Sequence, residues 1–574
     1  MAMVINTNVS SLTAQRALAE SNAELQTAME RLSTGSKINS AADDAAGLAM
    51  TQRMTAQVKG LAMAVKNAND GQALTQSIEG ALGEVSDMLQ RMRELALQAA
   101  NGTNSSADRT FLQSEVNLLI QEISRVATNT RYNGELILDG TFLNKALQVG
   151  IEEGENIIFS VESVAAEAVG AHTLVGNGIG ASPAAADPAA NPTTVEDDIE
   201  IFGFLGTKST EASTNDSAKQ TAVKINNLTG ETGVKAYAKT FVSLASNDAT
   251  AKTYSVKING YSTGNFVISS GDVESAVDSI NQISGSTGVT ASSSGNKVIL
   301  FDSDGDDITI ENTQTLSGHD DLVVAKLGED GSVTNVIGQE INLAVSGGND
   351  ATRVTGTLKM VSANPFSIDQ KFQTTTNTTN TLVNVSGGIS SGANKVVLDS
   401  LTGLGVGTAI RFAGDSDQPT THYITDINPD GDNALEISFT PAVDETIEDD
   451  SRVYVDSGYY SDAASTSTLK NLTEIRINTA LNAGDSISII DAALDKVAQM
   501  RSDLGAIENR LAYTVSNLMN IAEKTADARS RLDDADYALE SARLAKAQVV
   551  QQAGTSMLAQ ANQMTQLVLD LLRG

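Results

Sequence analysis

Three histidines are the side chains of this chain best suited to acid–base chemistry or metal binding: His172, His319 and His422. They are isolated from one another, and no H-E-x-x-H zinc motif, G-x-S-x-G nucleophile motif or Walker-type phosphate loop accompanies them. The chain has no Cys, which excludes disulfide bonds, thiolate nucleophiles and zinc–thiolate sites. We therefore predict a protein that is not an enzyme and has no catalytic, cofactor-binding or metal site.

Two short motifs have residue types that bind ions or phosphates elsewhere. "DSDGDD" at 302–307 resembles the start of a calcium loop, but it lacks the full EF-hand spacing and the closing Glu. "GLGVG" at 403–407 is rich in Gly, but it does not stand between a strand and a helix. We expect the first motif to be a solvated acidic β-turn and the second to be a plain turn.

The charge of the chain is strongly negative and unevenly distributed. The formal net charge is −33 and there is no Trp, so nothing offsets the repulsion from phosphates and nucleic acid is not an expected partner. Residues 151–480 contain 17 Lys and Arg against 44 Asp and Glu, whereas 1–150 contain 12 against 15 and 481–574 contain 9 against 12. The acidity therefore belongs to the middle of the chain.

Membrane insertion is not expected from the sequence. The start "MAMVINTNVS" lacks the basic residues and continuous apolar stretch of a signal peptide. No later run approaches the ~20 apolar residues of a membrane span. A cytoplasmic protein is the plain interpretation, and export by a route that reads no cleaved signal stays open.

The prolines divide the chain in the same places as the charge. All seven lie between Pro183 and Pro441, and the flanks on either side are rich in Ala, Leu, Gln, Met and Arg, which favours helices. In the first flank an apolar seam with spacings of four and three runs through Met54, Val58, Leu61, Val65 and Ala68, and resumes at Ile78, Leu82, Val85, Leu89, Met92, Ala96 and Ala99. This spacing predicts one long coiled-coil helix over 50–100, about 75 Å in length.

Further seams follow on both sides of the middle. A second helix is predicted by Leu112, Val116, Leu119, Ile123 and Val126. Asn133-Gly134 then gives a strong hairpin-turn signal. After the middle, apolar residues repeat every seven positions at Val497, Leu504, Leu511 and Leu518. The two flanks therefore carry matching seams that are expected to pack together.

Apolar stripes also run along both extreme ends of the chain. Their members include Ile5, Leu12, Leu25 and Leu32 at the start, and Val550, Met557, Met564, Val568, Leu571 and Leu572 at the end. A coiled coil closed within one chain explains the inner helices. It explains the extreme ends poorly, because two single helices would leave much of their apolar stripes exposed to water. Exposed apolar patches mark association surfaces.

The middle, roughly 175–480, has the pattern of β structure. Short alternating runs such as "YSVKING", "NFVIS", "KVILF", "DITIE", "KVVLD", "AIRFA" and "EISFT" are separated by Gly, Asp and Asn turns. One helix is expected at "GDVESAVDSINQI", and "NGIGASPAAADPAANPTT" has the composition of a loop or linker. The segment "TTTNTTNT" is polar and of low complexity.

Several long motifs at both ends resemble bacterial flagellin. They are "RLSTGSKINSAADDAAGLAM", "QRMRELALQAANGT", "RYNGELIL", "LGAIENRL" and "SRLDDADYALESARLAKAQVVQQAGTSMLAQANQM". The stretch "YSVKINGYSTGNFVISSGDVESAVDSINQISGSTGVTASS" also resembles a small repeat-like module of the outer regions of flagellins. The resemblance covers about 240 terminal residues, and residues 321–480 resemble nothing that we can place.

The resemblance implies an α+β multidomain fold and a structural role. Long coiled-coil-like helices from both termini, with a β-hairpin, would form a rod, and mainly β outer domains would be inserted in the middle. The subunit would polymerise into the helical filament used for swimming. The implied domains are 1–43 and 531–574 in the inner core, 44–175 and 481–530 in the rod, 176–320 as outer β-rich domains with the repeat-like module, and 321–480 as the outermost β-rich domain.

The resemblance also implies partners and a location. The partners would be further copies of the chain, the flagellar export apparatus and a secretion chaperone, the filament cap, the hook-associated junction proteins, and a host toll-like receptor. The location would be the extracellular flagellar filament, reached by secretion. The polymerisation core would be the apolar residues of the two terminal stripes.

Three residues are candidates for the receptor contact. Arg91 and Leu95, four apart, are expected to share a face off the seam of the long helix, and Glu115 is expected off the seam of the next helix. They match the family motif that looks like the contact surface for the receptor. An ordinary solvated helical face is the alternative for the same residues.

Two other functions remain as alternatives. The first is a hook-filament junction protein, which would also have terminal seams but would agree less well with the terminal motifs. The second is a filament protein whose middle is adhesive, enzymatic or metal-binding. A His/Glu cluster would mark a metal site or an enzyme and is absent from the sequence, whereas an adhesive domain has no sequence signature.

Overall fold

The computed structural model forms two compact units. Unit 1 is Met1–Ala81, Arg131–Glu162 and Arg501–Gly574, and unit 2 is Leu82–Thr130 and Ser163–Met500. The structure describes residues 7–573 apart from 179, 194–196, 247–249, 270, 315–320, 346–347, 371–380, 386–387, 402–403, 405–407, 414–421, 428–434, 456–457 and 461–463, and it does not describe the side chains of 409 and 565–573. His319 therefore lies outside the described residues, and so does most of "GLGVG" and "TTTNTTNT".

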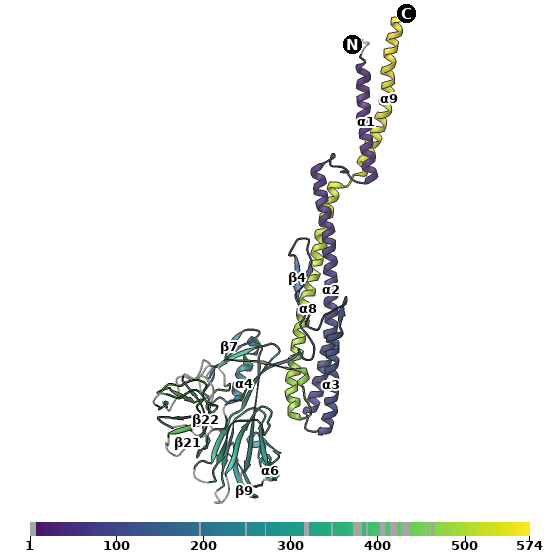
Figure 1. Ribbon diagram of the computed structural model, residues 1–574. Helices are drawn as coiled ribbons and strands as arrows, with labels where there is room; N and C mark the ends of the chain where they lie inside the picture. The colour runs from purple at the N-terminus through teal and green to yellow at the C-terminus, as the bar shows by residue number, and fades with distance from the viewer. Residues whose placement is uncertain are drawn as a thin grey trace. The chain divides into compact units, whose positions relative to one another are not determined.

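Five long helices form the two flanks, as the seams predicted. They are α1 (Val9–Thr34), α2 (Ala45–Ala100), α3 (Ser106–Asn129), α8 (Ala480–Asp533) and α9 (Tyr537–Arg573). Local signals place their ends: the Asn8 side chain accepts a hydrogen bond from the Ser11 amide at the start of α1, and α1 ends at Gly35 in the left-handed region. A capping box of Ser105 and Asp108 starts α3. Figure 1 shows that α2 and α8 are continuous helices.

Small cores hold α2 to α8 within unit 1. Leu61 and Ala64 on α2 pack with Leu518 on α8. One cluster farther along, Ala68 and Leu511 pack with Val149 and Ile157 of a β-hairpin. The hairpin strands are β3 (Lys145–Gln148) and β4 (Asn156–Phe159), preceded by β1 (Arg131–Tyr132) and β2 (Glu135–Leu136), whose turn is the predicted Asn133-Gly134. The β3–β4 hairpin therefore packs against both helices.

In unit 2 the second half of α2 lies between α3 and the start of α8. Arg93 donates to Asp491 on α8, with Nε and Oδ1 2.6 Å apart, whereas Arg91 pairs with Glu115 on α3. Two residues advance a helix by about 200°, so these two arginines leave α2 on opposite sides. The predicted seam from Leu82 through Ala99 is fully buried. On α3 the buried residues are Val116, Ile120, Ile123 and Ala127, so the seam is displaced by about one residue from the predicted Leu119 and Val126.

The middle of the chain is β structure, as predicted. Its strands are β5 (Gly170–Gly176), β6 (Ile199–Phe202), β7 (Thr207–Ser209), β8 (Lys235–Ser246), β9 (Lys252–Ile258), β10 (Tyr261–Ile268), β11 (Val289–Ser294), β12 (Lys297–Asp302), β13 (Ile308–Asn312), β14 (Leu322–Leu327), β15 (Val336–Leu343), β16 (Ala351–Val354), β17 (Thr357–Ser362), β18 (Ser367–Gln370), β19 (Lys395–Val397), β20 (Ala409–Phe412), β21 (His422–Ile427), β22 (Glu436–Thr440), β23 (Val453–Val455), β24 (Ala464–Thr466) and β25 (Thr468–Asn471). All described strand pairs of this region are antiparallel. A short 3₁₀ turn, Leu472–Glu474, follows the last strand.

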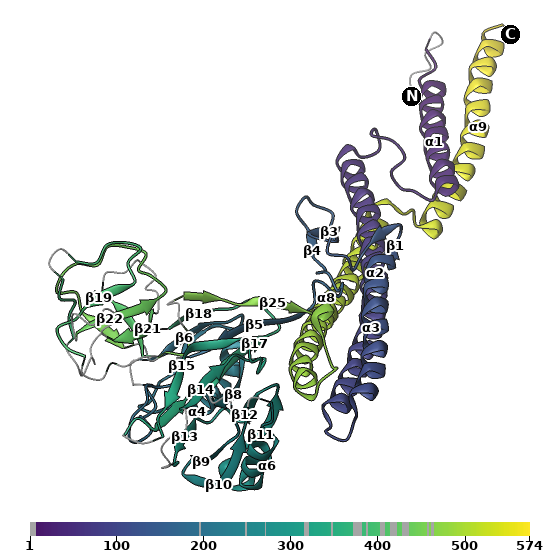
Figure 2. The ribbon, with the colours of Figure 1, turned by 60° about the horizontal axis from the view of Figure 1, so that its bottom comes forward.

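The strands form four larger sheets, seen best in Figure 2. An eight-stranded sheet has the path β11-β12-β8-β17-β5-β25 with β14 and β15 attached to β8. Two four-stranded sheets have the orders β10-β9-β13-β16 and β24-β18-β6-β7, and a five-stranded sheet has the order β19-β22-β21-β20-β23. Separate apolar cores lie within these sheets, including one around Phe412 and Phe439 in the five-stranded sheet and a smaller one around Phe241, Ile299 and Leu327 on the eight-stranded sheet. This sheet also contains the buried His422, whose Nδ1 lies 2.7 Å from the Pro441 carbonyl oxygen.

Among the described residues of the middle, four helices occur where the sequence predicted one. The predicted helix is α6 (Glu274–Gln282), followed by α7 (Ser284–Thr287). The prediction was wrong in omitting α4 (Ala218–Asn227) and α5 (Thr229–Thr232). A local signal for α4 was present, because Ser217 and Gln220 form a capping box with the spacing that such boxes require.

The "DSDGDD" motif is a turn whose carboxylates have partners within the chain. Lys219 lies 2.8 Å from Asp306 and 3.1 Å from Asp304, and Ser217 donates to Asp306. The Asp302 carboxylate accepts from the amides of Asp304 and Gly305. The motif therefore anchors the start of α4 to the end of β12, rather than presenting a free carboxylate cluster.

A lysine is buried in the middle of the β region. Lys326 on β14 is fully buried and donates to Thr355 Oγ1 at 3.2 Å and to the Gly356 carbonyl at 3.0 Å. Burial disfavours the charged form, and it lowers the pKa of Lys326 to about 7, despite the opposing attraction of Asp307.

This burial predicts a pH-dependent stability of unit 2. Between pH 7 and 10 the unfolded chain binds a proton at Lys326 that the folded chain lacks, so the free energy of unfolding should rise with pH, by up to about 1.4 kcal/mol per pH unit. Urea unfolding followed by tyrosine near-UV circular dichroism at pH 7, 8 and 9 measures this. Lys326→Met should flatten the slope, whereas the exposed-site control Lys235→Met should keep it; equal slopes in all three proteins would contradict the prediction.

Candidate assembly surface on the terminal helices

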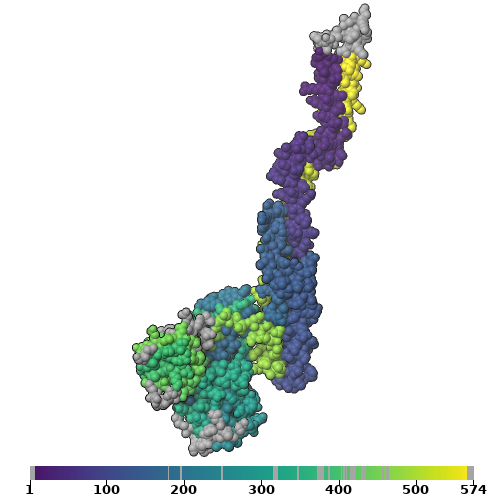
Figure 3. Space-filling model, viewed as in Figure 1, coloured from purple at the N-terminus to yellow at the C-terminus, as the bar shows by residue number. Residues whose placement is uncertain are grey.

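The two ends of the chain form an antiparallel helix pair within unit 1. Figures 1 and 3 show α1 and α9 side by side, with the start of α1 near the end of α9. Hydrogen bonds join the helices along their length: Asn8 Nδ2 to the Ala561 carbonyl at 3.0 Å, Ser21 Oγ to the Ala547 carbonyl at 3.0 Å, and the Tyr537 hydroxyl to the Leu32 carbonyl at 3.2 Å. The pair is therefore held by polar bonds at its start, middle and end.

An ion pair lies at the end of this helix pair where α1 ends and α9 begins. Glu540 on α9 is buried and accepts from Arg31 at 3.3 Å and from Arg543 at 2.9 Å. Next to it, the Ala535 amide donates to the Gly35 carbonyl at 2.9 Å. The attraction of two guanidinium groups offsets the desolvation cost of the buried carboxylate, so removing Arg31 would leave Glu540 paired only with the exposed Arg543. The sequence analysis did not identify these residues, because no local pattern links Arg31 to Glu540.

Small residues fill the contact between the two helices. Ser11, Ser21 and Ala28 on α1 and Ala547 on α9 are buried. At Gly554 a Cβ atom would lie 2.9 Å from Leu18 Cδ1, so Leu18 packs directly onto the glycine backbone. Small side chains let two helix backbones approach closely, but they bury little apolar area. The contact therefore depends on close approach and hydrogen bonds.

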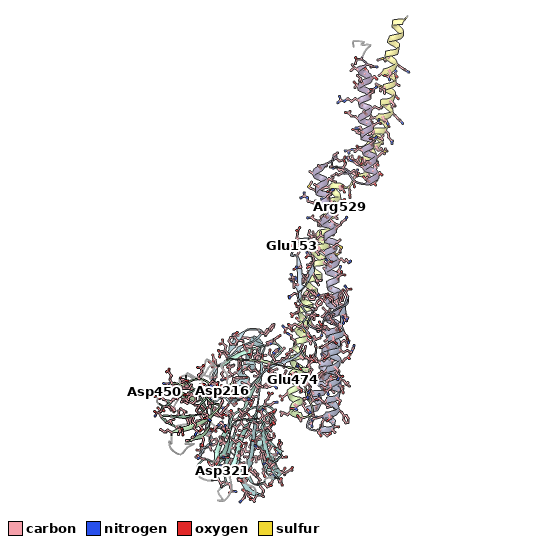
Figure 4. The ribbon with its side chains drawn as sticks, in the orientation of Figure 1. Glu153, Asp216, Asp321, Asp450, Glu474 and Arg529 are labelled. Atoms are coloured by element: carbon pink, nitrogen blue, oxygen red, sulfur yellow. The ribbon has the colours of Figure 1, made fainter. Side chains whose placement is uncertain are left out.

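The large apolar side chains of this pair mostly point away from it. Exposed ones are Val9, Leu12, Met29, Leu539, Val549, Val550, Met557 and Met564. Met557 and Met564 are 65% and 63% exposed, although they lie seven residues apart on one helix face. Figure 4 draws the side chains along both helices. A row of such residues is an apolar surface that one chain leaves in water.

The ten residues predicted for the polymerisation core fall into four groups. Leu12, Val550, Met557 and Met564 are exposed, and Leu25 and Leu32 are half-buried. Ile5 lies outside the described residues. Val568, Leu571 and Leu572 lie on α9, but their side chains are outside the described ones. The sequence prediction that α1 and α9 leave apolar stripes uncovered thus holds for the described residues, whereas the small-residue contact that joins the helices was not foreseen.

The receptor candidates lie on α2 and α3 in unit 2. Arg91 pairs with Glu115 at 2.9 Å and with Glu94 at 2.9 Å, and all three side chains are substantially exposed. The expectation for Leu95 was wrong, because only 1% of this residue is exposed. The reason is geometric: Leu95 lies one turn after Arg91, on the side of α2 that faces α3. Leu95 belongs to the helix core, and Arg91 and Glu115 form an exposed ion pair above it.

Within the described residues, no group of three or more His, Asp or Glu side chains is arranged to hold a metal ion. Nor does any described helix combine the length and apolar character that crossing a membrane requires. His172 on β5 is half-buried, and desolvation together with nearby Lys496 lowers its pKa. His172 and His422 belong to different sheets, and His319 is outside the described residues.

Comparisons with known proteins agree at both ends and over the whole length. The family model "Bacterial flagellin N-terminal helical region" matches residues 5–143, and "Bacterial flagellin C-terminal helical region" matches residues 487–572. The B-type flagellin of Pseudomonas aeruginosa is 31% identical, and the flagellin of Salmonella typhimurium is 33% identical, each over 100% of both chains. A solved structure of flagellar hook associated protein-3 from Legionella pneumophila is 11% identical to this chain, with a TM-score of 0.30, and the match covers 84% of this chain and 98% of that one.

The small-residue contact between α1 and α9 gives a prediction about helix stability. Ala547→Leu should overpack the buried contact and destabilise it by about 1–3 kcal/mol. Amide hydrogen exchange in peptides from residues 9–34 should then become faster. The control Val549→Leu changes an exposed position two residues away on the same helix and should leave exchange unchanged. Unaltered exchange in Ala547→Leu would show that the contact is absent in solution.

Proposed function

The chain belongs to the bacterial flagellin family, and from this premise we propose that its subunits polymerise through the exposed apolar faces of α1 and α9. The protein is a structural subunit of the helical flagellar filament used for swimming. The family consists of structural proteins, which accords with a function that needs no catalysis. The observation that carries the proposal is the row of large apolar side chains that α1 and α9 leave exposed.

A physical argument connects this surface to a filament. Covering a methionine or valine side chain contributes roughly 1.5–3 kcal/mol relative to leaving it in water. Because α1 and α9 already contact each other through small residues, the cover for the large ones must come from other copies. A contact that repeats between different surfaces, without closing into a ring, generates a helical polymer. The proposed layers are 1–43 and 531–574 inside, 44–175 and 481–530 as the rod around them, and 176–320 and 321–480 outside.

Observed breaks in the helices support the inner boundaries of this division. α1 ends at Thr34 and α2 begins at Ala45, and α8 ends at Asp533 and α9 begins at Tyr537. The charge distribution also suits this division into inner and outer layers. Nearly neutral helices can pack densely, whereas acidic outer surfaces repel unwanted side-to-side association. Asp216, Asp321 and Asp450, labelled in Figure 4, are part of the acidic middle.

Further partners are part of the same proposal. The export apparatus and a secretion chaperone would handle the chain before assembly, and the filament cap and hook-associated junction proteins would adjoin the polymer. The filament position would be extracellular. Of the alternatives, a hook-filament junction protein is less well supported, since the full-length relatives named above are flagellins. An adhesive function of the outer domains stays a second candidate without a specific site.

We also propose that Arg91 and Glu115 contact the host toll-like receptor, with Leu95 acting through the packing of α2 on α3. An exposed arginine paired with carboxylates offers the charged chemistry that protein interfaces favour. A filament that covers this face would hide it, so recognition would be a property of the monomer.

The assembly surface is tested by replacing exposed residues that folding does not need. Met557→Ser together with Met564→Ser should raise the critical concentration for seeded polymerisation about tenfold or more, since two buried apolar contacts are lost. The helical circular dichroism of the monomer should stay unchanged. Deleting 563–574 should abolish extension of seeds. Val267→Ser, an exposed change in the middle, serves as the control; normal filaments from the double variant and the truncation would refute the assignment.

The receptor contact is tested with monomers in a receptor-reporter assay. Arg91→Ala should lower potency by about tenfold or more without loss of helicity, because a charge-assisted contact is worth roughly 1.5–3 kcal/mol. Arg125→Ala is the matched control, since Arg125 forms a similar exposed pair with Glu122. Leu95→Ala should lower the thermal midpoint as well as potency, because the residue is buried. Equal potency of Arg91→Ala and Arg125→Ala would argue against the contact.

A further inference from the structure

The turn between β6 and β7 exposes a group of large apolar side chains in unit 2. Its sequence is "FGFLG" at 202–206. Phe204 and Leu205 are 57% and 59% exposed, and Phe202 and Tyr237 beside them are also exposed. Single exposed apolar residues are common on protein surfaces, but a cluster on one tight turn needs an explanation.

A second copy of the same local fold within the chain supplies a comparison. The segment 199–236 contains a β-hairpin (β6 and β7), a helix (α4), one further turn of helix (α5), a glycine in the left-handed region and a strand (β8). The segment 252–291 contains the same succession as β9, β10, α6, α7, Gly288 and β11. "INNLTGETGVKA" at 225–236 and "INQISGSTGVTA" at 280–291 align without a gap.

The two segments also share their hydrogen bonds. The Asn226 side chain bonds both the amide and the carbonyl of Ala236, and Asn281 bonds both groups of Ala291 in the same way. Fully buried isoleucines, Ile225 and Ile280, precede these asparagines. Agreement in sequence, in the order of strands and helices, and in side-chain hydrogen bonds identifies 199–236 and 252–291 as two copies of one module.

The two copies differ at the hairpin turn. In the second copy the turn is Asn259-Gly260, with both residues at positive φ, a polar two-residue connection. The first copy has four residues there, 203–206, of which Phe204 and Leu205 are large and apolar, and the paired Phe202 precedes them. Because the second copy closes its hairpin with polar residues, folding of the module does not require the apolar side chains of the first.

The first turn is also held rigidly. Gly203 lies so close to α5 that a Cβ atom would be 1.9 Å from the Thr232 carbonyl oxygen, and its amide donates to the Gly206 carbonyl at 3.0 Å. Leu205 lies against Gly233, where a Cβ atom would be 3.6 Å from Leu205 Cγ. The exposed side chains therefore stand on a fixed backbone, which lowers the entropy lost on binding.

A hollow beside the turn extends the apolar surface. A cavity of about 330 Å³ is lined by Phe204, Leu205 and Tyr237, by Ala363 after β17, and by Ala492 and Asp495 of α8. Lys235 lies 3.5 Å from Asp495 in the same lining, a polar contact next to the apolar residues. An apolar centre with a polar rim is the usual composition of a protein-binding site.

The same unit carries a protruding apolar face elsewhere. Phe111 and Leu118 on α3 are 74% and 65% exposed, and their spacing of seven residues places them on one helix face. Between them, Glu115 is already paired with Arg91. Unit 2 thus presents a concave apolar surface at the β6–β7 turn and a convex one on α3.

We propose that the β6–β7 turn and its cavity bind the α3 face of a second copy of this chain. The proposal rests on assembly of the chain into a filament and adds a contact between the outer module of one subunit and a rod helix of the next. Because the two surfaces differ, the contact is heterologous and can repeat along a filament. A net charge of −33 makes two copies repel, so contacts between them should centre on uncharged surfaces such as these.

The absence of Cys makes cross-linking a clean test. Filaments of the double variant Leu205→Cys/Leu118→Cys, confirmed by electron microscopy, are treated with a short bis-maleimide. The expected result is a ladder of covalent multimers, with monomer only when unassembled chains are treated at the same concentration. Tyr261→Cys/Leu118→Cys is the matched control, because Tyr261 is the exposed residue at the turn of the second copy. It should give monomer. Intact filaments without a ladder, or equal ladders from both variants, would overturn the proposal.

A second measurement covers the case in which the cysteine variants do not assemble. Phe204→Ser/Leu205→Ser should raise the critical concentration for seeded polymerisation severalfold compared with Tyr261→Ser, and the thermal midpoint of the β region should stay the same. Filaments would still form, because α1 and α9 are unchanged, whereas failure of the terminal assembly surface would show in the Met557 and Met564 variants. A wild-type critical concentration in Phe204→Ser/Leu205→Ser would overturn the proposal and leave the turn free for another partner.

Discussion

The contact between α1 and α9 determines what the rest of the molecule has to do. Two helices that meet through serine, alanine and glycine can lie close together and share hydrogen bonds, but they bury little apolar area. Their large side chains, among them Leu12 and Met557, then stay in water. An isolated helix pair of this kind gains little stability from its own packing. In the proposed assembly, other copies of the chain cover these side chains.

The acidic middle is compatible with this constraint because it is chemically unlike the ends. Its carboxylates keep the β region solvated, and several are used internally, as Asp304 and Asp306 are by Lys219. The fully buried Lys326 has its partners within the middle, since it donates to Thr355 and Gly356. The region can therefore fold around its own apolar cores while the flanks retain the apolar surface for assembly.

The duplicated module shows how one fold can be given different surfaces. Asn226 and Asn281 tie helix to strand by the same pair of bonds, so the frame is preserved in both copies. Changes are tolerated at the hairpin turns, because turn residues are exposed and contribute little to the module core. The turn with Phe204 and the turn with Asn259 can therefore differ in chemistry without altering the modules that carry them.

The sequence by itself determined the long helices of the flanks, the β character of the middle and the assignment of the chain to its family. Heptad spacing predicted α2 and α8 through residues such as Leu89 and Leu511, because periodicity along one helix is a local property. It did not determine which residues meet across space. Only the tertiary structure buried Leu95 against α3 and joined Arg31 to Glu540, since each depends on the relative placement of segments far apart in the chain. A spacing pattern gives the faces of a helix, but the neighbours that cover each face are decided by packing.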